Sequence, residues 1–314
     1  MTIQAERSGV TTTDGVRLNV ETTGSPDAPV TVLLVHGWTC STRSWHNQVE
    51  ELPRILGPNG VRVVTYDHRG HGRSDAAPAG SMRIEQLADD LETVLDTVVG
   101  DGPVVYAGHS MGGMTLMALA DQRPELFGSR IAAAALVSTS SGHIAEGAFG
   151  IPRRFDATAA AFAPRAMNLL STRLERRAHR APRPLDMAVR VRRPALRQLV
   201  FGKKTDPAEV DLFLADLASL PGPSYGGFFE AILKHERDHA LKVLEQLPVE
   251  IMHGTRDRLL PPRHANRMAA ELPTARLWMY PGAGHMLMQE RPRDVTHRLA
   301  SLARRVGGSV PKNG

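Results

Sequence analysis

The chain has a single cysteine, Cys40, few aromatic residues and no long hydrophobic run. One cysteine excludes an internal disulfide. The longest uninterrupted apolar stretch, residues 131–137, is far shorter than the roughly 20 residues that span a bilayer. Residues 1–9 contain no apolar segment of the kind that a secretory signal needs, so no signal peptide is expected. These absences predict a cytoplasmic protein without disulfides or membrane-spanning helices.

Apolar residues make up 42% of the 314 residues, which is enough for one large core. Chains of α/β proteins commonly reach this length as a single unit. The expected strands are residues 16–21, 31–35, 61–66, 104–107, 131–137, 249–252 and 276–280. The expected helices are residues 44–56, 82–99, 111–122, 263–272 and 292–306. This alternation predicts an α/β fold with a mostly parallel, doubly wound sheet and helices on both of its faces.

The most informative motif is Gly-His-Ser-Met-Gly at residues 108–112, which reads G-x-S-x-G. It directly follows the expected strand 104–107 and opens the expected helix 111–122. In this strand–turn–helix context the motif indicates a nucleophilic serine, because a turn flanked by glycines exposes the hydroxyl at the head of the helix. The sequence therefore predicts Ser110 as a nucleophile.

A serine nucleophile needs a base, and the base needs a carboxylate that orients it. Asp257 follows the expected strand 249–252, and His285 follows the expected strand 276–280. Both lie just past the carboxyl ends of strands, where open α/β sheets place their ligand sites. Each alone is an ordinary loop residue. Because they follow Ser110 in the order acid and then histidine, we expect Asp257 and His285 to be the acid and the base.

A further element supports acyl transfer, whose tetrahedral intermediate carries an oxyanion that needs preorganised N–H donors. The apolar run 31–35 fits a strand buried on both faces, and His36-Gly37-Trp38 follows it. The backbone N–H groups of Trp38 and Met111 are the predicted oxyanion hole. One comes from this loop and the other from the residue after the serine.

Together these motifs resemble those of the α/β-hydrolase-fold serine hydrolases, most closely the capped carboxylesterase and lipase branch. The resemblance includes the loop 66–74, in which Asp67 is expected to accept hydrogen bonds rather than to act on substrate. Relatives that are epoxide hydrolases or haloalkane dehalogenases carry aspartate where Ser110 stands. The resemblance thus implies an esterase that forms an acyl-enzyme on Ser110, with no cofactor and no metal. Thioesters of CoA or acyl carrier protein, and lactones, stay open because the same site would serve them.

Between residues 142 and 235 the alternation of strands and helices stops, although helical patterning continues and several prolines occur. The family inserts its cap here, after the sixth strand of its sheet. The resemblance therefore implies a core of residues 1–141 and 236–314 and a helical cap, or lid, of residues 142–235. A lid over Ser110 would exclude water and shape a pocket for a small-molecule or lipid-like ester.

The cap sequence is unusually basic. Residues 153–204 contain twelve Arg and two Lys against three acidic residues, a net charge of +11, so the rest of the chain carries −6. The simplest interpretation is an amphipathic helix, with Met167, Leu170, Leu174 and Ala178 on its apolar face and a solvated basic face. The alternative is an anionic partner: a membrane surface, acyl-CoA or acyl carrier protein. No nucleic-acid partner is expected, because no recognition motif accompanies the charge.

Two other classes of function remain open. Residues 235–239 read His-Glu-Arg-Asp-His and match H-E-x-x-H, in which two histidines on one face of a helix bind zinc. Matches this short arise by chance, and a charged helix surface is the better explanation of the segment. The other class is a hydrolase fold that acts only as a binding protein. Such proteins usually lose a member of the triad, and Ser110, Asp257 and His285 are all present.

The basic segment generates a test based on salt. If it binds an anionic partner, turnover of acyl-CoA should weaken as salt rises, because the Debye length falls from about 10 Å at 0.1 M to about 3 Å at 1 M. A small neutral ester is the control and should barely respond. Reversing Arg173, Arg176, Arg177 and Arg180 to Glu should reproduce the high-salt result at low salt. Identical salt curves for the two substrates would leave only a solvated basic face.

Overall fold

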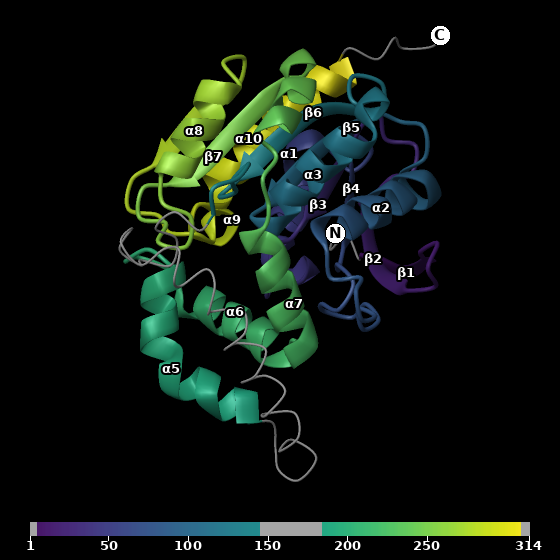
Figure 1. Cartoon of the computed structure of the whole chain (residues 1–314). Helices are drawn as coiled ribbons and strands as arrows, with labels where there is room; N and C mark the ends of the chain where they lie inside the picture. The colour runs from purple at the N-terminus through teal and green to yellow at the C-terminus, as the bar shows by residue number, and fades with distance from the viewer. Residues whose placement is uncertain (1–4, 145–183, 309–314) are drawn as a thin grey trace.

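A computed structural model describes residues 5–144 and 184–308 of the chain. In this part, eight strands form one sheet in the order β1-β2-β4-β3-β5-β6-β7-β8 (Figure 1). The strands are β1 Glu6–Thr11, β2 Arg17–Gly24, β3 Thr31–Val35, β4 Arg62–Tyr66, β5 Val104–His109, β6 Ile131–Val137, β7 Val249–Gly254 and β8 Arg276–Tyr280. β2 pairs antiparallel with both of its neighbours, β1 and β4, and the pairings from β4 through β8 are all parallel. The predicted α/β fold with a mostly parallel sheet is confirmed.

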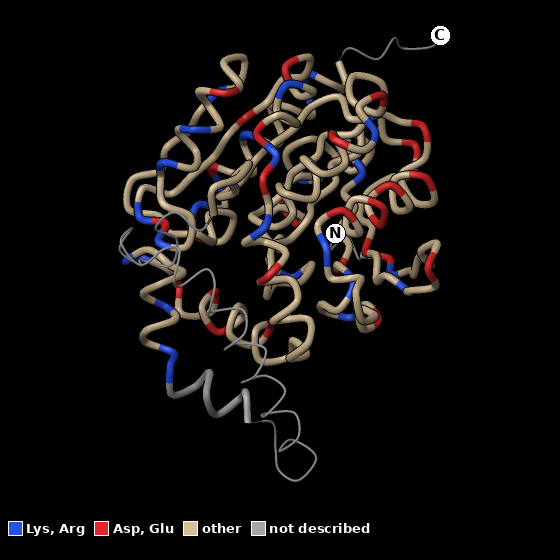
Figure 2. The backbone as a smooth tube through the Cα atoms, viewed as in Figure 1, with Lys and Arg blue, Asp and Glu red and all other residues tan. Residues whose placement is uncertain are grey.

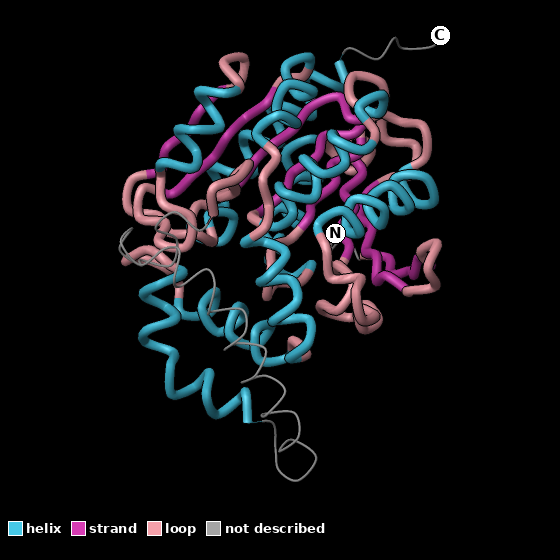
Figure 3. Tube along the Cα trace, in the orientation of Figure 1, coloured by secondary structure: helices cyan, strands magenta, loops and turns pink. Residues whose placement is uncertain are grey.

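Helices cover both faces of the sheet, as Figure 3 shows. They are α1 His46–Leu56, α2 Ile84–Val94, α3 Met111–Gln122, α8 Arg263–Glu271, α9 Leu287–Glu290 and α10 Pro292–Gly308, with the 3₁₀ helices η1 Thr42–Trp45, η3 Pro124–Leu126 and η6 Asp238–Gln246. Successive side chains of a strand point to opposite faces. Leu33 accordingly packs in the core cluster that contains α2 and α3, and Leu34 packs in the cluster that contains α1 and α10.

The edge of the sheet differs from the prediction, because β1 was not expected. Its sequence, Glu-Arg-Ser-Gly-Val-Thr, buries only Val10 and has no apolar alternation. The strand forms through backbone pairing with β2, which leaves no periodic signal in the side chains. The predicted helix 82–99 is also two elements, since α2 ends at Val94 and a π-helical turn, η2 Leu95–Val99, follows it.

Three α-helices lie between β6 and β7 in the described part of the chain, before η6: α5 Pro184–Val200, α6 Pro207–Ser219 and α7 Gly222–Leu233. They gather at one end of the sheet, apart from the two helical layers (Figure 1). This agrees with a helical cap inserted after the sixth strand, while its limits at residues 142 and 235 stay a prediction. The expected helix with the apolar face from Met167 to Ala178 lies outside the described residues. None of the described helices is long and apolar enough to cross a membrane.

Candidate active site

Ser110 lies at the junction of β5 and α3 in a strained backbone conformation, with φ 51° and ψ −114°. Positive φ is uncommon for residues other than glycine, and such strain costs on the order of 1–3 kcal/mol. Two hydrogen bonds hold it: Ser110 N donates to Val137 O at 3.0 Å, and Thr139 Oγ1 donates to Ser110 O at 2.7 Å. Both partners belong to β6 or the residues that follow it. The neighbouring strand therefore fixes the turn that presents the Ser110 side chain.

The glycines of the motif are required by close packing. A Cβ on Gly112 would lie 2.4 Å from Val35 O, and one on Gly108 would lie 2.6 Å from the carbonyl carbon of Gly112. Backbone cannot move aside cheaply at such distances, since protein interiors are close-packed. The turn is therefore too tight for side chains at both motif glycines, as the sequence pattern predicted.

Asp257 and His285 are in direct contact. His285 Nδ1 lies 2.7 Å from Asp257 Oδ2, and the backbone N–H groups of Leu259 and Leu260 donate to Asp257 Oδ1 at 3.0 and 2.8 Å. Asp257 is only 3% exposed. Burial by itself raises the pKa of this carboxyl, but the charge and hydrogen bond of His285 outweigh it and lower the pKa below its ordinary value. The Asp257 carboxylate therefore stays ionised at neutral pH and accepts a hydrogen bond from His285 Nδ1.

The loop that carries His285 is held by partners that the sequence did not reveal. His285 N donates to Val200 O at 2.8 Å, and Val200 is the last residue of α5. The Glu290 carboxylate accepts from Gly284 N at 3.0 Å, and His109 Nε2 lies 3.0 Å from His285 O. Burial holds the pKa of His109 well below its ordinary value, so a neutral ring donates to that carbonyl. No motif marks these contacts, and those with Val200 and His109 join segments far apart in the chain.

The loop of Trp38 passes directly beside the serine. A Cβ on Gly37 would lie 2.7 Å from His109 Nδ1 and 3.0 Å from Ser110 Cβ, so glycine permits this close approach. Met111 is the first residue of α3, and N–H groups at that position of a helix have no intrahelical carbonyl to bind. Trp38 follows Gly37, and Met111 follows Ser110. The two predicted oxyanion donors therefore lie in two chain segments that are in contact.

Ser110, His285 and Trp38 line a cavity of about 180 Å³. Its polar members include Ser110, His285, Thr39 and Tyr225, and the rest of its lining is largely apolar. The apolar lining comes from both the core and the cap: Met114, Ile144, Leu196, Leu199, Val200, Phe213, Leu217, Phe229, Ile232, Leu259, Leu260 and Met286. The Trp38 ring stacks on Tyr225 and Phe229 of α7, with ring centroids 4.5 and 5.3 Å away. Ser110 and His285 therefore face one shared, mostly apolar space.

The H-E-x-x-H segment does not have the geometry of a zinc site. His235 follows the end of α7 in a loop, and the 3₁₀ helix η6 begins only at Asp238. His235 is buried, which lowers its pKa to about 3, whereas the His239 side chain is 65% exposed and lies 2.9 Å from Asp121. No α-helix spans residues 235–239 to bring both rings to one face. Within residues 5–144 and 184–308, no group of three potential ligands is arranged to hold a metal ion.

The charge asymmetry seen in the sequence is visible in the described part of the cap. Figure 2 shows basic residues on α5, whereas acidic residues gather on and beside α2. Arg192 and Arg193 of α5 are exposed, and Arg193 pairs with Asp211 of α6 at 2.5 Å. Lys203 and Lys204 in the following loop are exposed as well. The arginines from 153 to 183 lie outside the described residues.

The chain is similar to a known protein family and to several characterised proteins. A family model described as the alpha/beta hydrolase fold matches residues 30–292. The chain is 27% identical over 300 residues to the bifunctional esterase/perhydrolase DCH of Acinetobacter calcoaceticus, which covers 94% of this chain and 99% of that protein. It is 40% identical to lipase LipV of Mycobacterium tuberculosis over 111 residues, or 35% of this chain and 38% of LipV. A solved thermophilic esterase from Thermogutta terrifontis superposes with a TM-score of 0.71 at 23% identity, covering 96% of this chain and 100% of that one.

Proposed function

The chain belongs to the α/β-hydrolase fold family and is an ester hydrolase of that family, and we propose that it works through an acyl-enzyme formed on Ser110. One observation carries the proposal. Ser110 and His285 line the same cavity, and His285 Nδ1 binds the buried Asp257 carboxylate at 2.7 Å. A nucleophile, a base and a carboxylate that orients the base are the parts that serine chemistry needs.

The tautomer of His285 supports the role of base. Because the ionised Asp257 can only accept, Nδ1 of His285 carries the proton of their hydrogen bond, and Nε2 is the nitrogen left to act on Ser110. In the proposed reaction His285 takes the proton of Ser110, whose Oγ attacks the ester carbonyl. The N–H groups of Trp38 and Met111 bind the oxyanion that forms. His285 then protonates the departing alcohol and activates the water that hydrolyses the acyl-enzyme.

The cavity suggests which acyl groups fit. Its volume of about 180 Å³ lies below the range of roughly 300–1,000 Å³ that is usual for drug-sized ligands. Its lining supplies hydrophobic contact and the flat ring of Trp38 backed by Tyr225 and Phe229. We therefore propose short or medium apolar acyl groups, including those with a single aromatic ring, as the substrates.

A thioester is the second candidate substrate, and the basic cap is the observation that favours it. Arg192 and Arg193 of α5 are exposed, as are Lys203 and Lys204 in the loop after it. Leu196 and Leu199 of α5 line the cavity. An acyl group in the cavity would thus leave a phosphate-bearing leaving group near positive charge. The chemistry at Ser110 would be unchanged, because only the leaving group differs. A lactone would likewise need no other residues.

The roles of Ser110 and Asp257 can be separated by substitution. Ser110→Ala removes the nucleophile and should lower kcat for p-nitrophenyl butyrate by on the order of 10⁴-fold or more. Asp257→Asn keeps the shape of the side chain but favours the wrong tautomer of His285, so kcat should fall by roughly 10⁴-fold.

Circular dichroism checks that the Ser110→Ala and Asp257→Asn variants both keep the fold. Near-native turnover by Asp257→Asn would move the search to a carboxylate at the end of another strand.

Chain-length preference tests the size of the acyl site. Across p-nitrophenyl esters from acetate to palmitate, kcat/KM should peak among the short and medium chains and fall for the longest. Phe229→Ala enlarges the cavity without touching Ser110 or His285, so it should shift the optimum toward longer chains. An optimum at palmitate for the unmodified protein, or no shift in the variant, would contradict an acyl site in this cavity.

A further inference from the structure

Residues 37–43, here called the oxyanion loop, run from β3 into η1 and carry Trp38. The loop contains one strained residue, since Thr39 has φ 64°. A β-branched residue in this left-handed region is a genuine outlier. Such a conformation persists only where the surrounding structure over-determines it. The contacts around the loop must therefore hold Thr39 in this conformation.

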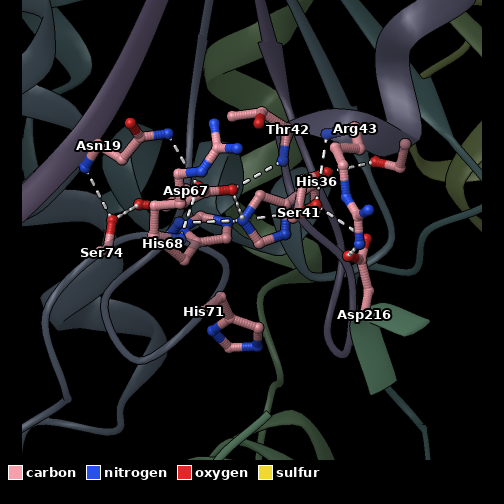
Figure 4. Close-up of polar contacts among 12 residues, drawn as sticks. Asn19, His36, Ser41, Thr42, Arg43, Asp67, His68, His71, Ser74 and Asp216 are labelled. Carbon is pink, nitrogen blue, oxygen red and sulfur yellow. Dashed lines mark hydrogen bonds and ion pairs between the residues drawn. The ribbon is translucent and has the colours of Figure 1, made fainter. Parts of the chain in front are cut away.

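A core carboxylate anchors the loop from one side. Asp67 Oδ1 accepts from Thr42 N at 2.7 Å, and its Oδ2 accepts from Asn19 Nδ2 at 2.9 Å and from Arg73 N at 3.0 Å (Figure 4). Asp67 is 1% exposed, so these bonds replace water almost completely. This anchor belongs to the core, because Asp67 directly follows β4.

A cap carboxylate anchors the loop from the other side. Asp216 of α6 accepts from Ser41 Oγ at 2.8 Å through Oδ2, and its Oδ1 pairs with the guanidinium of Arg43 (Figure 4). Asp216 is 6% exposed, and its backbone carbonyl accepts from Ser219 Oγ at 2.8 Å. Charge-assisted bonds of this kind are stronger than neutral ones and fix geometry. The cap is therefore bonded to the residues that immediately follow the strained part of the oxyanion loop.

We propose that Asp216 is a positioning residue of this enzyme: it ties the oxyanion loop to the cap and thereby holds the Trp38 N–H where the oxyanion develops. The inference rests on the proposed acyl-enzyme function. A donor stabilises the transition state fully only when it is oriented before the reaction. Seating the cap and completing the oxyanion hole are then one event, because α6 supplies both the wall residues Phe213 and Leu217 and the loop anchor.

Asp216→Asn tests the proposal in the full-length protein. Loss of the ion pair with Arg43 should let the loop relax, so kcat for p-nitrophenyl butyrate should fall about tenfold while KM stays within about twofold. Affinity for a trifluoromethyl ketone, which forms a tetrahedral adduct on a serine, should fall in parallel with kcat. Asp211→Asn is the matched control, since it removes a carboxylate of the same helix that pairs only with the exposed Arg193 among the contacts described. Its kcat should remain unchanged.

Ser41→Ala removes the hydrogen bond between Ser41 and Asp216 from the side of the loop. It should lower kcat in the same direction as Asp216→Asn, and the double variant should be less impaired than the product of the two single effects. Such non-additivity is expected of residues that act through one contact. If Asp216→Asn fails to fold, Ser41→Ala and Arg43→Met carry the test. The Arg43 side chain is half exposed, so replacing it changes the ion pair without emptying a buried position.

Three results would overturn the positioning role. A lower melting temperature with unchanged kcat would make Asp216 a structural tether only. A higher KM with unchanged kcat would mean that Asp216 seats the cap for substrate binding alone. An Asp211→Asn variant as impaired as Asp216→Asn would point to general loosening of the cap. Failure of the proposed function is distinguished from all three, because a fluorophosphonate would then not label Ser110 of the unmodified protein.

Discussion

The strained turn at Ser110 is the constraint on which the rest of the site depends. Its positive φ lifts the side chain off the end of β5, and hydrogen bonds to Val137 and Thr139 hold it there. The same turn forces glycine at position 112, where the backbone comes against Val35 O at the end of β3. Because β3 leads directly into the loop of Trp38, this contact also brings that loop beside the serine. One tight packing contact thus brings Ser110, the proposed nucleophile, into line with both proposed oxyanion donors.

The cap is part of the site rather than a cover for it. Its helix α5 ends at Val200, whose carbonyl accepts from His285 N at 2.8 Å, and its helix α6 holds the oxyanion loop through Asp216. The cap residues Tyr225 and Phe229 also stack on Trp38. Backbone, charged and aromatic contacts therefore link the cap to three different parts of the proposed machinery. A change in the position of these helices would disturb the proposed catalytic geometry together with the shape of the cavity.

Sequence analysis predicted the sheet and the candidate site where motifs have a fixed local meaning. G-x-S-x-G, the His-Gly-Trp loop and the order of Asp257 and His285 each follow an apolar strand, and strands of a parallel sheet end at a common edge. What the sequence did not reveal depends on contacts without local pattern. β1 forms by backbone pairing with few buried side chains. Asp216 lies 175 residues from Ser41, and nothing in the surrounding helix distinguishes it from an ordinary polar position.

The central claim is that turnover proceeds through a covalent acyl group on Ser110. The most direct measurement is acid quenching of the protein within the first turnover of p-nitrophenyl acetate, followed by intact mass and peptide mapping. We expect one acetyl group per chain on the peptide that contains Ser110, formed with a burst of p-nitrophenol and lost on further incubation in water. An acetyl group on another residue, or esterase turnover with no adduct in the quenched protein and no burst, would contradict it.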